Sequence, residues 1–133
     1  MNSDISVSTT SSRDDRAGSG RFPKGGATWV HFGANLGAAD GELSLQSASD
    51  DLRQLTEFAL GGAGQTPEVV APKTLVPSGE TRDIHRAGGR YITLVGSNPL
   101  FHLPEDRWPH AVDVDVVTRV ATAAASLVVK LTR

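Results

Sequence analysis

The sequence has 133 residues, of which 38% are hydrophobic and 21% are charged, a balance typical of one soluble globular domain. The formal net charge of -2 gives no electrostatic basis for binding nucleic acid or an anionic membrane surface, so we expect neither as a partner. Cysteine is absent, which excludes disulfides, thiolate metal sites and a cysteine nucleophile.

The N-terminus lacks a basic start followed by an apolar segment, and no apolar run approaches the roughly 20 residues that span a bilayer. We therefore expect a cytoplasmic protein. Residues 1–26 are rich in Ser, Thr, Asp, Arg and Gly and nearly devoid of apolar side chains. Burial cannot offset the ordering entropy of such a segment, so we expect a disordered leader (1–26) followed by one domain (27–133).

The domain begins with a predicted strand at 27–32, which is short, β-branched and aromatic and ends before Gly33. A helix is expected to start near Ser47, because Asp50 follows at a capping-box spacing, and to stop at Gly61-Gly62. Prolines interrupt residues 68–76, which favours an edge strand or a loop with extended ends.

A short helix is predicted over 80–87, followed by a strand over 90–96 whose nearly continuous apolar run is typical of burial on both faces. Asp113 is a good N-cap for a long, amphipathic final helix, in which apolar residues recur at helical spacing from Val116 to Leu131. The expected fold is α/β: a small layered sheet with flanking helices and at least partly parallel strands.

The first candidate site is His102, just beyond the expected buried strand, where open α/β sheets usually bind ligands. The alternative is a loop histidine hydrogen-bonded to a carboxylate such as Asp106. Glu80 and Asp83 could share one side of a helix, whereas His85 would point elsewhere; a solvated helix face explains this group without a site.

Three further places have simpler interpretations. Residues 33–39 form a turn of small residues without the spacing of a phosphate-binding loop. His31 lies within an apolar strand and is expected to be packed, while His110 is expected to be exposed. The sequence contains no HExxH, Walker, GxSxG or EF-hand motif, and we assign no catalytic and no substrate-binding residue.

The string GGRYITLVGSNPLFHLPEDRWPHAVDVDVV and the alanine-rich helix after it resemble the end of the co-catalytic zinc aminopeptidase family. The order of conserved residue types in that family is matched by Phe101-His102, Pro104, Asp106 and Val112-Asp113. An upstream motif of the family keeps its spacing in this chain, at Gly79-Glu80, Ile84 and Gly88, but the polar residues of the motif are replaced here. The segment from Trp29 to Asn35 is similar to a strand that carries a metal-binding Asp, and residues 47–64 resemble the next helix. The likeness covers about residues 27–131.

This resemblance implies the C-terminal part of a zinc exopeptidase domain, with His102 at a metal-ligand position. The family's two zinc ions need further carboxylates, histidines and a Glu general base. In the family, the first His, the bridging Asp and the adjacent Glu pair lie before the region of resemblance. Residues 1–26 of this chain contain neither His nor Glu that could replace them, and Asn35 stands where an Asp is expected. The resemblance therefore implies that this chain alone is inactive and binds no zinc tightly.

Two hypotheses follow. In the first, the chain is part of an exopeptidase-like domain, and a peptide is a substrate only if another chain completes the site. In the second, it is a non-catalytic interaction module that forms a homodimer or pairs with a chain carrying the rest of the domain, because uncovered sheet edges and apolar patches bind other chains.

Overall fold

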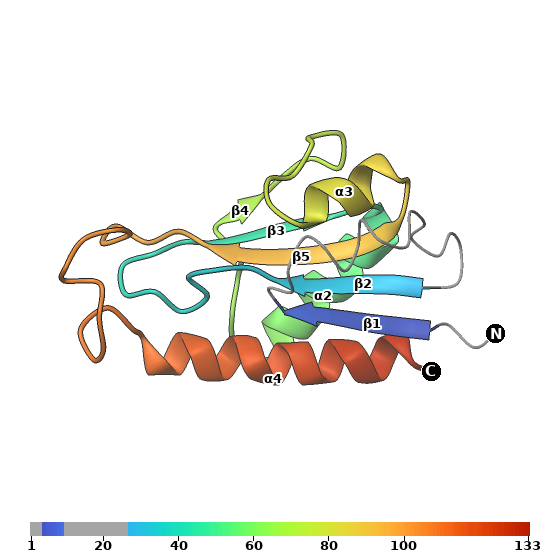
Figure 1. Cartoon of the computed structure of the whole chain (residues 1–133). Coiled ribbons are helices and arrows are strands. Elements are labelled where there is room, and N and C mark those ends of the chain that lie inside the picture. Colours follow the sequence, from blue (N-terminus) through green and yellow to red (C-terminus); the bar gives the residue numbers. More distant parts are fainter. Residues whose placement is uncertain (1–3, 10–26) are drawn as a thin grey trace.

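Helices on both faces of a mixed sheet make up the fold (Figure 1), and the computed structural model describes residues 4–9 and 27–133. The expected α/β class, with a small sheet, flanking helices and a long C-terminal helix, is confirmed. The elements in chain order are β1 (Asp4–Thr9), β2 (Ala27–Phe32), β3 (Leu43–Ser47), α2 (Asp50–Gly62), β4 (Val69–Val70), α3 (Thr81–Arg86), β5 (Arg90–Gly96) and α4 (Val114–Leu131).

The central strand of the sheet is β5, and the strand order is β1-β2-β5-β3-β4. β5 is parallel to β2 and antiparallel to β3, while β1 and β4 pair in parallel with β2 and β3. Residues 91–94 of β5 are all buried, as the apolar run predicts. β4 is a two-residue edge strand, which agrees with the expectation from the surrounding prolines.

The two faces of the sheet differ in chemistry. On one face Val30, Leu45 and Leu94 join the main hydrophobic cluster, which α2 and α4 complete with Leu60 and Leu127. The opposite face presents His31, Gln46, Tyr91 and Thr93 beneath α3, which lies across the sheet from α4 (Figure 1). Alternation along each strand produces this division, because successive side chains point to opposite faces.

Asp113 caps α4 as predicted, since its Oδ1 accepts hydrogen bonds from the backbone N–H groups of Asp115 (3.0 Å) and Val116 (3.2 Å). No described helix is both long and apolar enough to cross a membrane.

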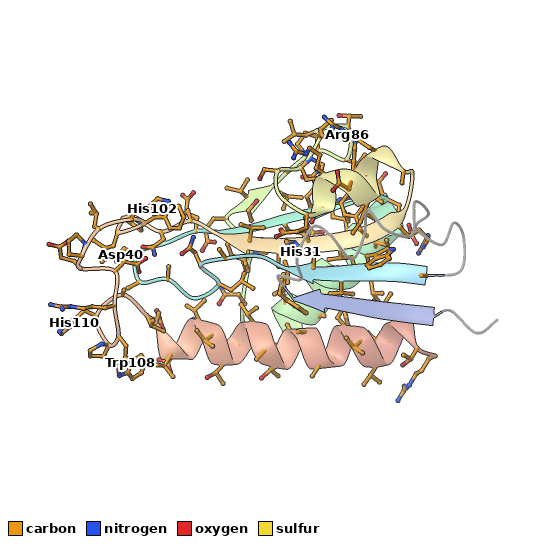
Figure 2. All side chains as sticks on the ribbon, in the orientation of Figure 1. His31, Asp40, Arg86, His102, Trp108 and His110 are labelled. Atoms are coloured by element: carbon orange, nitrogen blue, oxygen red, sulfur yellow. The ribbon has the colours of Figure 1, made fainter. Side chains whose placement is uncertain are left out.

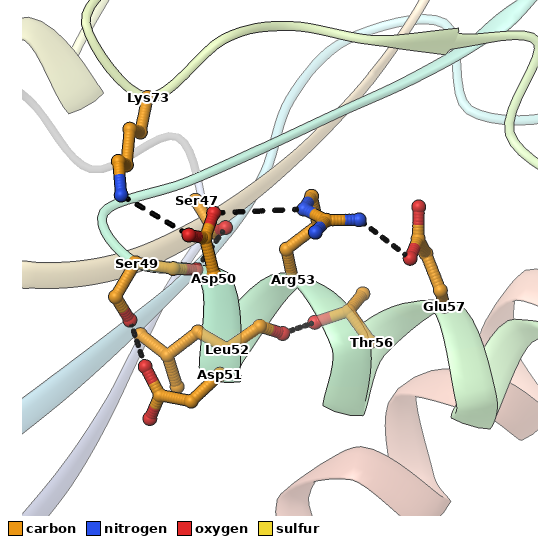
Figure 3. Close-up of polar contacts among 9 residues, drawn as sticks. All are labelled: Ser47, Ser49, Asp50, Asp51, Leu52, Arg53, Thr56, Glu57 and Lys73. Atoms are coloured by element: carbon orange, nitrogen blue, oxygen red, sulfur yellow. Dashed lines mark hydrogen bonds and ion pairs between the residues drawn. The ribbon is translucent and has the colours of Figure 1, made fainter.

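The start of α2 differs from the prediction (Figure 3). Ser47 is the last residue of β3, and its hydroxyl donates to the backbone oxygen of Ser49 at 2.9 Å. The helix begins only at Asp50, because pairing with β5 holds Ser47 in an extended conformation. The Ser49 hydroxyl donates to Asp51 and, together with Arg90, lowers the pKa of the Asp51 carboxyl.

Two strands were not expected from the sequence. β3 is short, yet its alternating Leu43 and Leu45 are both buried. The second is β1, which lies inside the expected disordered leader and pairs with β2 over its full length. Backbone hydrogen bonds to a sheet edge explain β1, because they do not depend on a large apolar side chain at each position. The remainder of the expected leader, residues 1–3 and 10–26, lies outside the described residues.

Candidate functional site

The loops that follow β2 and β5 meet at one end of the sheet, because these parallel strands end together. The backbone N–H of Gly33 donates to the backbone oxygen of Leu94 (2.8 Å), and the backbone N–H of Gly96 donates to the backbone oxygen of Ala34 (2.9 Å). The Asn98 amide joins the two loops by donating to Asn35 Oδ1 (3.1 Å) and Asp106 Oδ1 (2.9 Å). Figure 2 places His102, Trp108 and His110 at this end.

His102 is exposed in the loop after β5, at the position expected of a ligand-binding residue in an α/β sheet. Its backbone is left-handed (φ 66°), and its ring lies against that of Phe101 with centroids 3.8 Å apart. Asp106 accepts a hydrogen bond from the Asn98 amide, and its pairing with His102 stays a prediction. Within residues 4–9 and 27–133, no three His, Asp or Glu side chains are grouped as a metal site.

Beneath α3, a layer of polar side chains covers the second face of the sheet. His31 is buried, as predicted, and its Nδ1 lies 2.8 Å from the Thr93 hydroxyl of the neighbouring strand. Its Nε2 lies 3.4 Å from Oε2 of Glu80, at the start of α3. The interpretation of Glu80 as part of a solvated helix face is therefore wrong, because the carboxylate turns toward the sheet.

His85 and Tyr91 form the other half of this polar layer. Nδ1 of His85 lies 2.7 Å from the Tyr91 hydroxyl, and the two rings meet edge to face. Gln46 donates to the backbone oxygen of Leu75 at 2.6 Å, and its Nε2 is 3.5 Å from the Tyr91 hydroxyl. Burial raises the pKa of Tyr91, and the hydrogen bond with Gln46 partly opposes this change. The His85–Tyr91 contact ties α3 to the sheet, and the Gln46–Leu75 hydrogen bond ties the segment before α3 to it, which gives the layer a structural role.

The remaining predicted positions keep simple roles. His110 is exposed, as expected. Residues 33–39 form a turn rather than a cradle, and Asn35 (φ 62°) and Gly37 (φ 81°) are left-handed there. A side chain at Gly37 would overlap Val117, so this turn is fitted closely against the start of α4.

The most distinctive surface lies along α4. An apolar groove with a volume of about 330 Å³ runs between this helix and the end of β2. Its lining residues are Phe32, Leu36, Val117, Val120, Ala121 and Ala124. We call the adjoining side of the helix the α4 flank, and define it as Val114, Val117, Ala121, Ala124, Ala125 and Val128.

The α4 flank is accessible to solvent although every member is apolar. Val114 is 51% exposed and Val117 is 39% exposed, and Ala121 and Ala125 are also exposed. The buried side of the same helix carries Val120, Ala123 and Leu127, so α4 has two apolar sides rather than one. The apolar residues span more of the helix surface than packing on the sheet requires, and this width is the sequence signal for the second side.

Comparison with protein-family models, with curated proteins and with solved structures found no match to this sequence.

Proposed function

We propose that this chain is an association module that binds another polypeptide along the α4 flank and does not turn over a substrate by itself. The observation that carries the proposal is the groove between α4 and the end of β2, which continues along the helix onto Val114, Ala125 and Val128. Contiguous apolar surface of this kind is typical of protein-binding sites, because its burial removes it from water at a gain of about 25 cal/mol per Å².

The absence of charge from the α4 flank supports this proposal. Between Asp115 and Lys130 the helix carries one charged residue, Arg119. Its Nε donates to Oε1 of Gln65 at 2.9 Å, on the side of the helix that faces the end of α2. A partner can therefore cover the flank without burying an unpaired charge, which would be costly.

The resemblance to zinc aminopeptidases supports the second part of the proposal. If residues 27–131 correspond to the end of such a domain, His102 is a ligand position whose companion ligands and general base would have to come from another chain. The proposed partners are accordingly a second copy of this chain or a polypeptide that carries the rest of the domain. Hydrolysis of a peptide would then require the completed site.

Sedimentation velocity at tens of micromolar tests the association. The variant Ala121→Glu places a charge in the groove, and Thr122→Glu places the same charge at the next, exposed position of α4 as the matched control. We expect the wild type and Thr122→Glu to associate and Ala121→Glu to remain monomeric, with equal helix content by circular dichroism. Association that is insensitive to Ala121→Glu, or a well-folded wild-type monomer, would contradict the proposal.

A second assay tests the absence of turnover. The wild type is incubated with zinc and an aminoacyl-nitroanilide, and we expect no release of the nitroaniline above the level without protein. Zinc-dependent release that His102→Ala abolishes would show that the chain is an enzyme by itself and would refute this part of the proposal.

A further inference from the structure

We infer that Asp40 is a site of spontaneous backbone modification, at which the folded chain converts aspartate to isoaspartate. This inference is independent of the proposed association through the α4 flank. Asp40 lies in the turn between β2 and β3, next to Gly41, at the end of the sheet where Figure 2 also places His102. Three features of the turn carry the inference: the residue that follows Asp40, the freedom of its carboxyl group and the access of water to the turn.

The reaction needs only the side chain of an aspartate and the backbone nitrogen of the next residue. The nitrogen of Gly41 attacks Cγ of the Asp40 carboxylic acid, so that an N–C bond forms, a C–O bond breaks, and the amide proton leaves with the hydroxyl group as water. The product is a five-membered succinimide ring. A water molecule then opens the ring at one of its two carbonyl carbons, which restores aspartate or gives isoaspartate. Water is released once and consumed once, so no further reactant is required.

The residue after Asp40 favours closure of this ring. Asp40-Gly41 is the single Asp-Gly pair in the sequence, which contains no Asn-Gly pair. Glycine has no side chain to shield its backbone nitrogen, and it permits backbone angles that other residues avoid. Asp115, in contrast, is followed by Val116, whose β-branched side chain crowds the attacking nitrogen.

The carboxyl group of Asp40 is free to approach that nitrogen. Asp40 is exposed, and its carboxyl group takes part in none of the hydrogen bonds and ion pairs of the described part of the chain. Several other aspartates are held by donors, among them Asp51 by Ser49, Asp106 by Asn98, and Asp113 by the backbone of Asp115. Asp40 can therefore rotate toward Gly41 without first losing a contact.

The nitrogen of Gly41 is weakly held and lies beside space for water. Its N–H donates to the backbone oxygen of Ala38 at 3.1 Å, near the long end of the range for such bonds. A hollow of about 40 Å³ is lined in part by Ala38 and Gly41, and space of this size holds the water that opens the ring. Both steps of the reaction can therefore take place in the folded turn.

The modification would act on the junction between β3 and the loop after β5. Isoaspartate lengthens the main chain by one carbon atom directly before Gly41, where an added Cβ atom would already overlap the backbone oxygen of Ser97. Beside this contact, the backbone N–H of Glu42 donates to Ser97 Oγ (2.8 Å), and the backbone N–H of Ser97 donates to the backbone oxygen of Glu42 (2.9 Å). Because the junction has no room for another atom, the isoaspartyl form should unfold at a lower temperature than the unmodified protein.

Incubation of the full chain in water enriched in the heavy oxygen isotope tests the reaction, because each ring opening places one heavy oxygen atom in the residue. After several weeks at neutral pH and physiological temperature, the protein is digested in ordinary water, and mass-spectrometric fragmentation locates the label. We expect label at Asp40 to accumulate at least about tenfold faster than at Asp115, a difference of about 1.4 kcal/mol in activation free energy. Part of the labelled Asp40 should be isoaspartate, which electron-transfer fragmentation distinguishes from aspartate.

Two variants serve as matched controls. Asp40→Glu retains the carboxylate but would need a six-membered ring, which closes far more slowly, so position 40 should stay unlabelled. Asp40→Asn should form the same succinimide with loss of ammonia, and its product should carry the label. A folded wild type in which Asp40 gains no more label than Asp115 would overturn the inference. An Asp40→Asn variant that keeps its amide would also overturn it, because the turn would then prevent ring closure, and so would equal labelling of Asp40→Glu and the wild type.

Discussion

The Tyr91 hydroxyl lies 2.7 Å from Nδ1 of His85, and this contact links the central strand β5 to the helix α3 that covers it. The contact is part of a wider polar layer in which His31 also approaches α3 through Glu80 at 3.4 Å. One face of the sheet is thus covered by the apolar packing of α2 and α4, and the other by polar contacts together with the buried Ile84 of α3. The two faces should respond differently to pH and to substitution.

Tyr91 is the one tyrosine of the chain, so its phenolate absorbance can be followed directly. Because burial raises its pKa above the ordinary value of 10.0, we expect the folded protein to titrate later than the unfolded protein. Below about pH 10 both states keep the proton. As the pH rises from there through the higher folded pKa, the unfolded state loses its proton first, and the free energy of unfolding falls.

The variant Tyr91→Phe is the control for this titration. Its free energy of unfolding should no longer fall at alkaline pH. At neutral pH the substitution should lower the free energy of unfolding by about 1 kcal/mol, the usual net contribution of a hydrogen bond. Denaturant unfolding at several pH values measures both effects. Identical alkaline profiles for the variant and the wild type would show that Tyr91 is not the group responsible.

Two glycines should respond in opposite directions to replacement by alanine. A side chain at Gly96 would overlap the backbone oxygen of Asn35, where the loop after β2 crosses the end of β5. Gly96→Ala should therefore destabilise the fold by about 1–3 kcal/mol, the usual cost of overpacking. Gly61 lies in α2, and a Cβ atom added there would meet open space, so Gly61→Ala should stabilise by about 0.5–1 kcal/mol. Thermal unfolding of the two variants measures the contrast, and a tolerant Gly96 would show that the loop can move aside.

The cap of α4 should be sensitive to the loss of one oxygen. Asp113→Ala removes the acceptor for the N–H groups of Asp115 and Val116 and should cost about 1 kcal/mol. Asp113→Asn retains a capping oxygen and should cost much less. Chemical denaturation of both variants measures the difference, and equal losses would indicate that the negative charge matters more than the hydrogen bonds.

The sequence alone predicted the elements whose signals are local. The strand at 27–32, the strand at 90–96 and the final helix capped by Asp113 all formed as expected, because β-branched runs and cap residues act over a few positions. β3 was missed although Leu43 and Leu45 alternate with polar residues. Its five residues form a strand because β5, a distant segment of the chain, pairs along them.

Tertiary structure decided which neighbours each polar residue and each helix side received. Glu80 could have faced solvent on an isolated helix, but docking of α3 on the sheet brings it to His31. The apolar residues of α4 follow one broad pattern in the sequence, and only packing divides them into a buried side against the core and an α4 flank beside the groove. Helical periodicity specifies which residues share a direction, whereas burial depends on what the rest of the chain places there.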